Sequence, residues 1–588
     1  MKKTKIVSTL GPASNTVEII ADLIEAGANV FRFNFSHGNH QEQKERMEQV
    51  REAVKRTGKA VGILLDTKGA EIRTTIQGTP NGKIAFEMGD QVRISMDGTL
   101  EGTREKIAVT YPQLFDDVHE GGHILFDDGL IDMKILEKDE ATRELVTEVQ
   151  NTGELGSRKG VNAPGVSISL PGITEKDAED IRFGLENEID FIAASFVRKA
   201  QDILEIREIL EEKEMTHVQI LAKIESQEGI NNIDEIIKVA DGIMVARGDM
   251  GVEIPAEEVP MVQKAIIKKC NAAGKSVITA TQMLESMQHN PRPTRAEASD
   301  VANAVFDGTD ATMLSGESAN GDYPVEAVAT MARIDLEAEK ALAGLGSFQI
   351  NRFDKTDVTE TTALSVARAA QNLGIKTIVA ATESGHTAKL ISKYRPDADI
   401  LAVTFDERTK RGLMLNWGVY PTVAEKPSTT DEMFELATKK AVDLGFAKEG
   451  DLILITAGVP VGERGTTNVM KIQLIGSKLL EAQGVGQRTV IANAVVASSA
   501  EEANKKAHEG MILVVPTTDS DYMPAIKQAS ALIVESGGLT SHAAVVGIAQ
   551  DLPVIVGATK ATSIVMDGEL ITADTRRGIV YRGETTAI

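Results

Sequence analysis

The stretch AVGILLDT at residues 60–67 shows the repeating unit that decides the fold of the first part of this chain. It is a short apolar run that ends in polar residues, and it follows the amphipathic, helix-like stretch 41–57. Seven similar runs alternate with helix-like stretches, at residues 5–10, 29–35, 190–195, 218–224, 242–247, 276–281 and 311–315. Eight strands that alternate with helices predict a (β/α)8 barrel. A doubly wound open sheet is the alternative, but neither G-x-G-x-x-G nor G-x-x-x-x-G-K-[ST] follows a strand-like run.

The gap after the third run, about residues 70–170, is too long for a loop between a strand and a helix. It contains short alternating runs separated by Gly and Asp turns, which predict a small β-barrel that acts as a lid. The α/β pattern restarts near residue 346, and EAQGVGQ at 481–487 is typical of a linker. The predicted domains are 1–69 with 171–345 for the catalytic barrel, 70–170 for the lid, 346–476 for an open-sheet α/β effector-binding domain and 477–588 for an extra small α/β tail domain.

The composition is that of an acidic globular protein. Among 588 residues, 87 Asp and Glu oppose 63 Lys and Arg, which gives a formal net charge of -24. This charge argues against a nucleic acid or an anionic membrane as partner, because both need a basic face. The single cysteine, Cys270, excludes a disulfide framework within the chain and fits a reducing compartment. The N-terminal MKKTKIVSTLGPAS is unlike a signal peptide, and no apolar stretch approaches the length of a membrane span, so we expect a cytoplasmic protein.

Polar residues gather at the ends of the eight runs, where the reactive groups of a (β/α)8 barrel lie. They are Arg32, Asn34, Ser36 and His37, Asp66 and Thr67, Lys223 and Glu225, Arg247, Gly248 and Asp249, and Thr281. Each of them alone is more often part of a surface ion pair or a helix cap. Together they predict phosphoryl transfer, because Lys and Arg stabilise the moving group and two carboxylates suit Mg²⁺. The sequence has no Cys/His cluster for Zn²⁺ and no G-x-S-x-G motif of a serine hydrolase.

Nine segments along residues 1–475 resemble the pyruvate kinase family. They are TLGPAS (9–14), NFSHG (34–38), LLDTKG (64–69), KGVNAPG (159–165), LPGITEKD (170–177), AKIES (222–226), VARGDMGVEIP (245–255), TATQMLESM (279–287) and NPRPTRAEASDVANAVFDGTDATMLSGES (290–318). The resemblance implies an enzyme that transfers the phosphoryl group of phosphoenolpyruvate to ADP, giving pyruvate and ATP in the last step of glycolysis. It also implies Mg²⁺ (or Mn²⁺) and K⁺ as cofactors, allosteric control and a homotetramer.

The resemblance also implies a role for each matching residue. Lys223 would stabilise the phosphoryl group in transfer, Arg32 would hold the phosphate of phosphoenolpyruvate, and Thr281 would lie near the enolate when it is protonated. The other implied positions are Gly248 and Asp249 for the substrate, Glu225 and Asp249 for Mg²⁺, Asn34, Ser36, Asp66 and Thr67 for K⁺, and Asn34, His37, Arg73 and Lys159 for the nucleotide.

Two residues near the predicted hinge bear on this resemblance. Family members with Glu at position 71 resemble K⁺-dependent enzymes, whereas those with Lys carry their own positive charge. Glu71 therefore predicts K⁺ dependence, because a second carboxylate near the phosphates needs a cation to balance it. Ala70 stands where the family usually has proline, and because proline fixes φ, we expect a looser lid.

The domain after the barrel carries a phosphate-binding effector site in this family. Here TESGHT (382–387) follows a strand-like run, and its Thr382, Ser384, Gly385 and Thr387 stand at the start of a helix, which suits an anion. An ordinary helix cap is the alternative. We expect a sugar phosphate or AMP as effector, with Arg464 of AGVPVGERGTTN (457–468) as a phosphate partner.

The tail segment GGLTSHAAVVG (537–547) resembles the phosphohistidine domain of phosphoenolpyruvate synthase and pyruvate phosphate dikinase, and it places His542 where those enzymes carry a phosphoryl group. Some bacterial pyruvate kinases, Bacillus-like ones especially, have such a tail. The tail is either a phosphoryl carrier or regulatory swivel, or a retained module that only packs on the main body, and we favour the retained module.

Two other functions are weighed against a pyruvate kinase. A dikinase-like enzyme is suggested by the tail, but no ATP-grasp-like domain precedes it, and such an enzyme would require AMP and pyrophosphate in place of ADP. A metabolite sensor without activity would need the loss of Lys223, Glu225 or Asp249, and all three are present.

Overall fold

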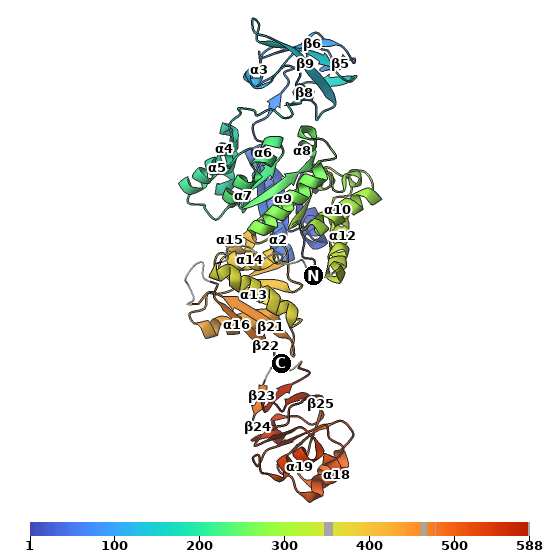
Figure 1. Ribbon diagram of the computed structural model, residues 1–588, viewed down its shortest axis with the longest axis vertical. Helices are drawn as coiled ribbons and strands as arrows, with labels where there is room; N and C mark the ends of the chain where they lie inside the picture. Colours follow the sequence, from blue (N-terminus) through green and yellow to red (C-terminus); the bar gives the residue numbers. More distant parts are fainter. Residues whose placement is uncertain (346–356, 460–466, 477, 586–588) are drawn as a thin grey trace. The chain divides into compact units, whose positions relative to one another are not determined.

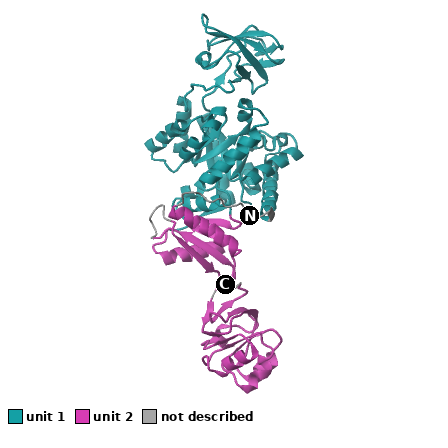
Figure 2. Cartoon of the chain, viewed as in Figure 1, with its two compact units in different colours: residues 1–354, 382–395, 404–425 teal, residues 355–381, 396–403, 426–588 magenta. Residues whose placement is uncertain are grey.

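The computed structural model describes residues 1–345, 357–459, 467–476 and 478–585. Two compact units divide the chain: residues 1–354, 382–395 and 404–425 form the first, and residues 355–381, 396–403 and 426–588 form the second (Figure 2). The four predicted domain ranges stay a prediction, since this division follows other boundaries. Among the described residues, no helix combines the length and the apolar character needed to cross a membrane.

The first unit contains a closed barrel of eight parallel strands, as predicted, in the order β1-β17-β16-β15-β14-β13-β3-β2. All eight predicted strands are present, with ends within one or two residues of the apolar runs. They are β1 Lys5–Thr9, β2 Val30–Asn34, β3 Gly62–Asp66, β13 Phe191–Ala194, β14 Gln219–Ile224, β15 Gly242–Ala246, β16 Ser276–Ala280 and β17 Ala311–Leu314.

Both faces of these strands are buried, which explains their continuous apolar runs. In β3, Leu64 belongs to a buried cluster within the barrel, whereas Ile63 and Leu65 pack in a larger cluster with the helices. The helices surround the strands (Figure 1). They are α1 Val17–Ala26, α2 His40–Thr57, α4 Glu175–Glu186, α5 Ala200–Glu212, α6 Gln227–Asn231, α7 Ile233–Val239, α8 Arg247–Glu253, α9 Val259–Ala273, α10 Arg295–Asp307, α11 Gly316–Ala319 and α12 Pro324–Leu345.

The segment between β3 and α4 forms a seven-stranded sheet in the order β4-β12-β8-β9-β10-β6-β7 and a two-stranded sheet of β11 and β5, where the sequence predicted a small barrel. Its elements are β4 Ile72–Arg73, β5 Lys83–Phe86, β6 Gln91–Ser95, β7 Lys106–Ala108, α3 Leu114–Asp117, β8 His123–Phe126, β9 Ile131–Asp139, β10 Glu144–Val149, β11 Gly153–Gly156 and β12 Gly160–Asn162. Alternating side chains such as Ile131, Met133 and Ile135 are buried in a core of the segment's own. We call residues 70–170 the lid.

The elements of the predicted effector domain that lie in the first unit are α14 His386–Lys393, α15 Glu407–Gly412 and β20 Val419–Val423. In the second unit, β18 Thr377–Ala381, β19 Asp399–Thr404 and β21 Leu452–Ala457 are parallel, and β22 Val469–Leu474 runs antiparallel to β21. The helices of this part are α13 Val358–Asn372 and α16 Thr430–Asp443. The predicted open α/β sheet is therefore present.

The tail is an eight-stranded sheet in the order β23-β30-β29-β25-β26-β27-β28-β24. Its strands are β23 Lys478–Glu481, β24 Gln483–Val485, β25 Thr489–Val496, β26 Ile512–Val515, β27 Ala531–Val534, β28 Val554–Val556, β29 Leu570–Asp574 and β30 Ile579–Arg582. Its helices are α17 Ala500–Lys506, α18 Met523–Ile526, α19 His542–Gln550 and α20 Ala561–Ile564.

The linker predicted at 481–487 is wrong, because β24 is part of the tail sheet and pairs with β28. Gly484 lies within the segment predicted as a linker, and a Cβ atom there would lie 1.8 Å from the carbonyl oxygen of Thr575. This glycine permits a close approach between two backbones and does not mark a flexible connection.

Candidate active site

Four predicted residues form a buried chain of alternating charges at the C-terminal ends of β2, β3 and β14. The Nε atom of Arg32 donates to Asp66, and its Nη1 donates to the Thr9 hydroxyl at 3.1 Å. The Nζ atom of Lys223 lies 3.2 Å from Oδ1 of Asp66 and 3.0 Å from Oε1 of Glu225. Asp66 and Glu225 are each 1% exposed, whereas the side chains of Arg32 and Lys223 are 12% and 11% exposed, so buried carboxylates hold two cations that keep a small exposed surface.

Asp66 is the central member of this chain. Burial alone would raise the pKa of its carboxyl group, but the positive charges of Arg32 and Lys223 outweigh burial and hold the pKa below its usual value. Burial would lower the pKa of Lys223, and Asp66 and Glu225 reverse that effect and raise it. Lys223 therefore stays charged throughout the physiological range.

Glu225 has a different environment. Burial raises its pKa, and the nearby charge of Asp249 adds to the rise, while Lys223 opposes it. Its Oε2 atom accepts a hydrogen bond from the backbone N–H of Phe196 at 2.6 Å. Two carboxylates that repel one another beside a lysine form a site that gains stability from a divalent cation.

The strand ends β15 and β16 bring Gly248 and Thr281 together. A Cβ atom at Gly248 would lie 3.0 Å from Cγ2 of Thr281, so the glycine permits close contact. Thr281 has φ of 73°, a left-handed conformation that β-branched residues rarely adopt. Arg247 fixes this turn, because its guanidinium donates to the carbonyl oxygens of Ala280 at 3.2 Å and Thr281 at 2.7 Å. A strained backbone held by a second residue is typical of functional sites.

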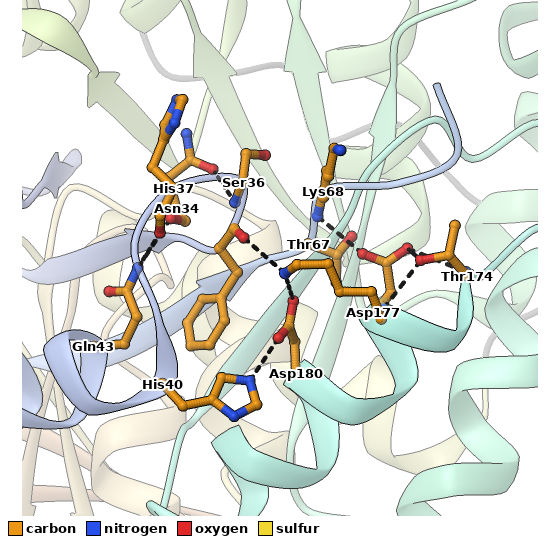
Figure 3. Close-up of polar contacts among 12 residues, drawn as sticks. Asn34, Ser36, His37, His40, Gln43, Thr67, Lys68, Thr174, Asp177 and Asp180 are labelled. Carbon is orange, nitrogen blue, oxygen red and sulfur yellow. Dashed lines mark hydrogen bonds and ion pairs between the residues drawn. The ribbon is translucent and has the colours of Figure 1, made fainter. Parts of the chain in front are cut away.

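Of the four residues predicted to hold K⁺, Asn34 and Asp66 end strands β2 and β3, and Ser36 and Thr67 lie on the connections that follow these strands. Figure 3 shows Asn34, Ser36 and Thr67. The strand ends at Asn34, so Ser36 and His37 lie in a turn and not on the predicted continuation of β2. Within this turn, the N–H of Ser36 donates to Oδ1 of Asn34 at 3.0 Å. The Thr67 hydroxyl accepts from the N–H of Ser195 at 3.0 Å.

The predicted nucleotide residues divide between two cavities. Arg73 and Lys159 line a cavity of about 450 Å³, together with Asp249. Arg32, Asn34 and His37 line another of about 420 Å³.

Both lid cations of the larger cavity are paired with carboxylates. Arg73 donates to Glu71 at 2.6 Å, and Lys159 donates to Asp127 at 2.9 Å. Phosphate groups that bind there would therefore compete with these two carboxylates.

The predicted effector residues of α14 and its preceding turn lie in the first unit. The N–H of Gly385 donates to the Thr382 hydroxyl at 3.0 Å, and Gly385 has φ of 81°, a conformation that favours glycine. Thr382 and Thr387 are buried. Arg464 lies outside the described residues, so its predicted role stays a prediction.

His542 begins helix α19 in the tail, where it is exposed. Its Nδ1 atom contacts the Thr518 hydroxyl at 3.2 Å, and Ser541 caps the helix by accepting from the N–H of Ala544 at 3.4 Å. The ring is thus anchored on one side and open to solvent.

Two members of this site were missed in the sequence. Ser195 donates from its hydroxyl to the carbonyl oxygen of Thr67 at 2.6 Å and accepts from Lys223 at 2.8 Å. The N–H of Phe196 holds Glu225. Ser195 ends one of the eight predicted runs, so the search for polar residues at strand ends could have found it. No sequence signal marks the backbone N–H of Phe196.

A barrel with two largely buried cations and two buried carboxylates at its strand ends defines a class of enzyme, the α/β-barrel enzymes that stabilise developing negative charge. Comparisons with known proteins narrow this class. The family model described as pyruvate kinase, barrel domain, matches residues 1–328, and the one described as pyruvate kinase, alpha/beta domain, matches residues 360–473. The model described as PEP-utilising enzyme, mobile domain, matches residues 507–578.

Relatives of full length give the same result. The chain is 63% identical to a pyruvate kinase of Lactobacillus delbrueckii subsp. bulgaricus and 56% identical to one of Geobacillus stearothermophilus, over 100% of both chains in each pair. The crystal structure of a pyruvate kinase from Cryptosporidium parvum has a TM-score of 0.76 and 40% identity, and the match covers 80% of this chain and 96% of that one. The chain belongs to the pyruvate kinase family.

Proposed function

We propose that the chain transfers the phosphoryl group of phosphoenolpyruvate to ADP, giving pyruvate and ATP, with Mg²⁺ and K⁺ as cofactors. The observation that carries this proposal is the buried chain of Arg32, Asp66, Lys223 and Glu225. Two fixed cations supply positive charge where a phosphoryl group and an enolate develop negative charge. In this proposal the enzyme catalyses the last step of glycolysis in the cytoplasm.

The environment of Lys223 supports its role as a fixed cation. Its ammonium group is held by Asp66, Ser195 and Glu225, so it needs no rearrangement when the phosphoryl group moves. Its raised pKa makes it a poor proton donor at neutral pH. In this proposal, the enolate is therefore protonated beside Thr281.

Glu225 and Asp249 fit a divalent cation, because the mutual repulsion of the two carboxylates is relieved by positive charge. Among the described residues, no group of three or more His, Cys, Asp or Glu side chains could hold a metal. The substrate and water would supply the remaining oxygen ligands, as is usual for Mg²⁺. When bound, Mg²⁺ neutralises negative charge on the phosphoryl group.

Asn34, Ser36, Asp66 and Thr67 offer the oxygen atoms of a K⁺ site, and the Glu71 carboxylate adds negative charge near the phosphates. Replacement of K⁺ by tetramethylammonium should lower the rate of pyruvate formation. An equal rate in the two salts contradicts the K⁺ part of the proposal and leaves the phosphoryl transfer intact.

The central test is the substitution Lys223→Met in a coupled assay with phosphoenolpyruvate, ADP, Mg²⁺ and K⁺. Loss of the fixed cation should lower kcat about 1,000-fold, the upper range for one electrostatic group. Lys44→Met, on the exposed face of α2, is the matched control and should keep full activity. If turnover persists in Lys223→Met, the assigned mechanism is wrong.

We also propose that Thr382, Ser384, Gly385 and Thr387, together with Arg464, bind a sugar phosphate or AMP that regulates a homotetramer. The glycine turn before α14 supports this, since it leaves backbone N–H groups at a helix N-terminus. Activity at low phosphoenolpyruvate, measured with a panel of sugar phosphates and AMP, tests it. An enzyme that responds to none of them has no such site.

One observation favours a second function for the tail. An exposed histidine at the first turn of α19, in a domain that matches the PEP-utilising mobile domain, is placed to accept a phosphoryl group. Mass spectrometry after incubation with phosphoenolpyruvate decides between the two uses of the tail. Phosphate on His542 identifies a carrier, and an unmodified histidine supports the retained module.

A further inference from the structure

Helix α4 holds the two connections that follow β2 and β3 beside the predicted K⁺ ligands, although α4 itself contributes none of these ligands. One connection follows β2 at residues 35–39, and the other follows β3 at residues 67–69. Neither has regular secondary structure, so the positions of their oxygen atoms depend on contacts from outside. Figure 3 shows these contacts.

Lys176 fixes the turn after β2 through the backbone. Its Nζ atom donates to the carbonyl oxygen of Phe35 at 3.1 Å, and the N–H of Phe35 donates to the carbonyl oxygen of Asp66 at 3.0 Å. Phe35 lies between the two predicted ligands Asn34 and Ser36. The backbone of Phe35 is therefore held at its N–H by the barrel strand β3 and at its carbonyl oxygen by α4.

Asp180 keeps Lys176 in this position. One carboxylate oxygen of Asp180 pairs with Lys176 at 2.5 Å, and the other contacts Nε2 of His40 at 2.7 Å. The His40 ring stacks on Phe183 with centroids 4.2 Å apart. Asp180 is 2% exposed, so this carboxylate is buried and satisfied by two partners on opposite sides.

Asp177 fixes the connection after β3. Its Oδ1 atom accepts from the N–H groups of Lys68 at 3.0 Å and Gly69 at 3.1 Å. Its Oδ2 atom accepts from the N–H and the hydroxyl of Thr174, in the cap of α4. From the barrel side, Gln43 donates to the carbonyl oxygens of Asn34 at 3.1 Å and His37 at 2.9 Å.

We propose that Lys176, Asp177 and Asp180 of α4 are positioning residues for the predicted K⁺ site. They set the positions of Asn34, Ser36 and Thr67 through backbone contacts and touch neither the substrate nor the cation. This inference rests on the proposed function, because it concerns the K⁺ site assigned there. Ligand oxygens that are held in advance bind an ion more tightly than oxygens that must be ordered when it binds.

Lys176 is the residue to change, because its side chain is 52% exposed and its loss leaves the core intact. In Lys176→Met, the apparent K⁺ concentration for half-maximal activity should rise about fivefold, the effect of one lost hydrogen bond. The N–H groups of Phe35, Ser36 and His37 should exchange with solvent about fivefold faster in the same variant without K⁺. Lys176→Arg should restore both values, and Lys44→Met should change neither.

The two measurements separate this inference from the proposed function. If the N–H groups of residues 35–37 exchange in Lys176→Met at the same rates as in the wild type, Lys176 has no positioning role. This holds whatever the K⁺ requirement of the variant. Faster exchange with an unchanged K⁺ requirement overturns the link between α4 and the cation. A wild-type enzyme that shows no K⁺ activation contradicts the proposed K⁺ site, and with it the proposed effect of α4 on K⁺ binding. The exchange rates would still show whether Lys176 positions the turn.

Discussion

The substitution Asp66→Asn removes one negative charge from the centre of the buried chain and keeps the shape of the side chain. In the wild type, Arg32 donates to Oδ2 of Asp66, and Lys223 donates to Oδ1. Asparagine has one acceptor oxygen in place of two, so at least one cation loses its partner. Its NH₂ group would then face that cation as a second donor.

The size of the effect follows from the burial of Asp66. Removal of one partner from a buried ion pair costs about 3–5 kcal/mol, since it leaves an uncompensated charge. The retained oxygen lowers this cost, and we expect a loss of about 3 kcal/mol in the free energy of unfolding at pH 7. Because the native pKa of Asp66 is depressed, its contribution is complete above the unfolded-state pKa of about 3.9 and is lost as pH falls through the lower native pKa.

Urea unfolding followed by tryptophan fluorescence measures this loss. The chain has a single tryptophan, Trp417, which is 8% exposed and belongs to the first unit, so its signal reports on that unit. Asp22→Asn, on the exposed face of α1, is the matched control and should unfold like the wild type. If Asp66→Asn unfolds within about 0.5 kcal/mol of the wild type, the size of an ordinary surface change, the electrostatic account of the buried chain is refuted.

Two further predictions concern the predicted substrate residue Gly248 and the buried Asp190. Gly248→Ala should lower kcat/KM at least tenfold, because the new Cβ would lie 3.0 Å from Thr281, and Gly251→Ala in the same helix, whose Cβ has no neighbour closer than 3.9 Å, should keep full activity. Equal activity of the two variants would contradict the close contact. Burial raises the pKa of Asp190 to about 6, although Arg411 opposes the rise, so the native state holds this proton more tightly than the unfolded state. The stability of the wild type relative to Asp190→Asn should therefore fall by about 3 kcal/mol as pH rises from 4 to 7, because each of two pKa units contributes about 1.36 kcal/mol. Urea unfolding of both proteins at several pH values measures this difference, and a difference that does not change with pH would contradict the prediction.

The barrel strands were predictable because their burial on two faces leaves a local signal. Ile63, Leu64 and Leu65 are apolar in succession, since one faces the barrel interior and two face the helices. The charged strand ends were predictable by the same logic. Parallel strands in a closed barrel place their C-terminal ends on one rim, and the structure brings Arg32 and Lys223 together there.

The contacts of α4 could not be predicted in this way. Thr174 and Asp177 are readable as a helix cap, and the structure contains that capping box. Nothing local shows that the other oxygen of Asp177 accepts from Lys68 and Gly69, which lie 109 and 108 positions away. A long-range hydrogen bond to a backbone N–H leaves no pattern in composition or periodicity. The misassigned linker has the same origin, because the neighbour that requires Gly484 lies far along the chain.

The carboxylate of Asp177 has a consequence for how this architecture can change. The chain leaves the barrel for the lid at Gly69 and returns at Thr174, and both residues bond to this one side chain. The lid, roughly one hundred residues long, is thus an insertion whose two ends lie side by side at one point of the barrel. An insertion whose ends lie side by side can be lengthened, exchanged or shortened to a brief turn without a change in the structure of the barrel. The barrel and the lid can therefore change independently of one another as long as the junction at Asp177 is kept.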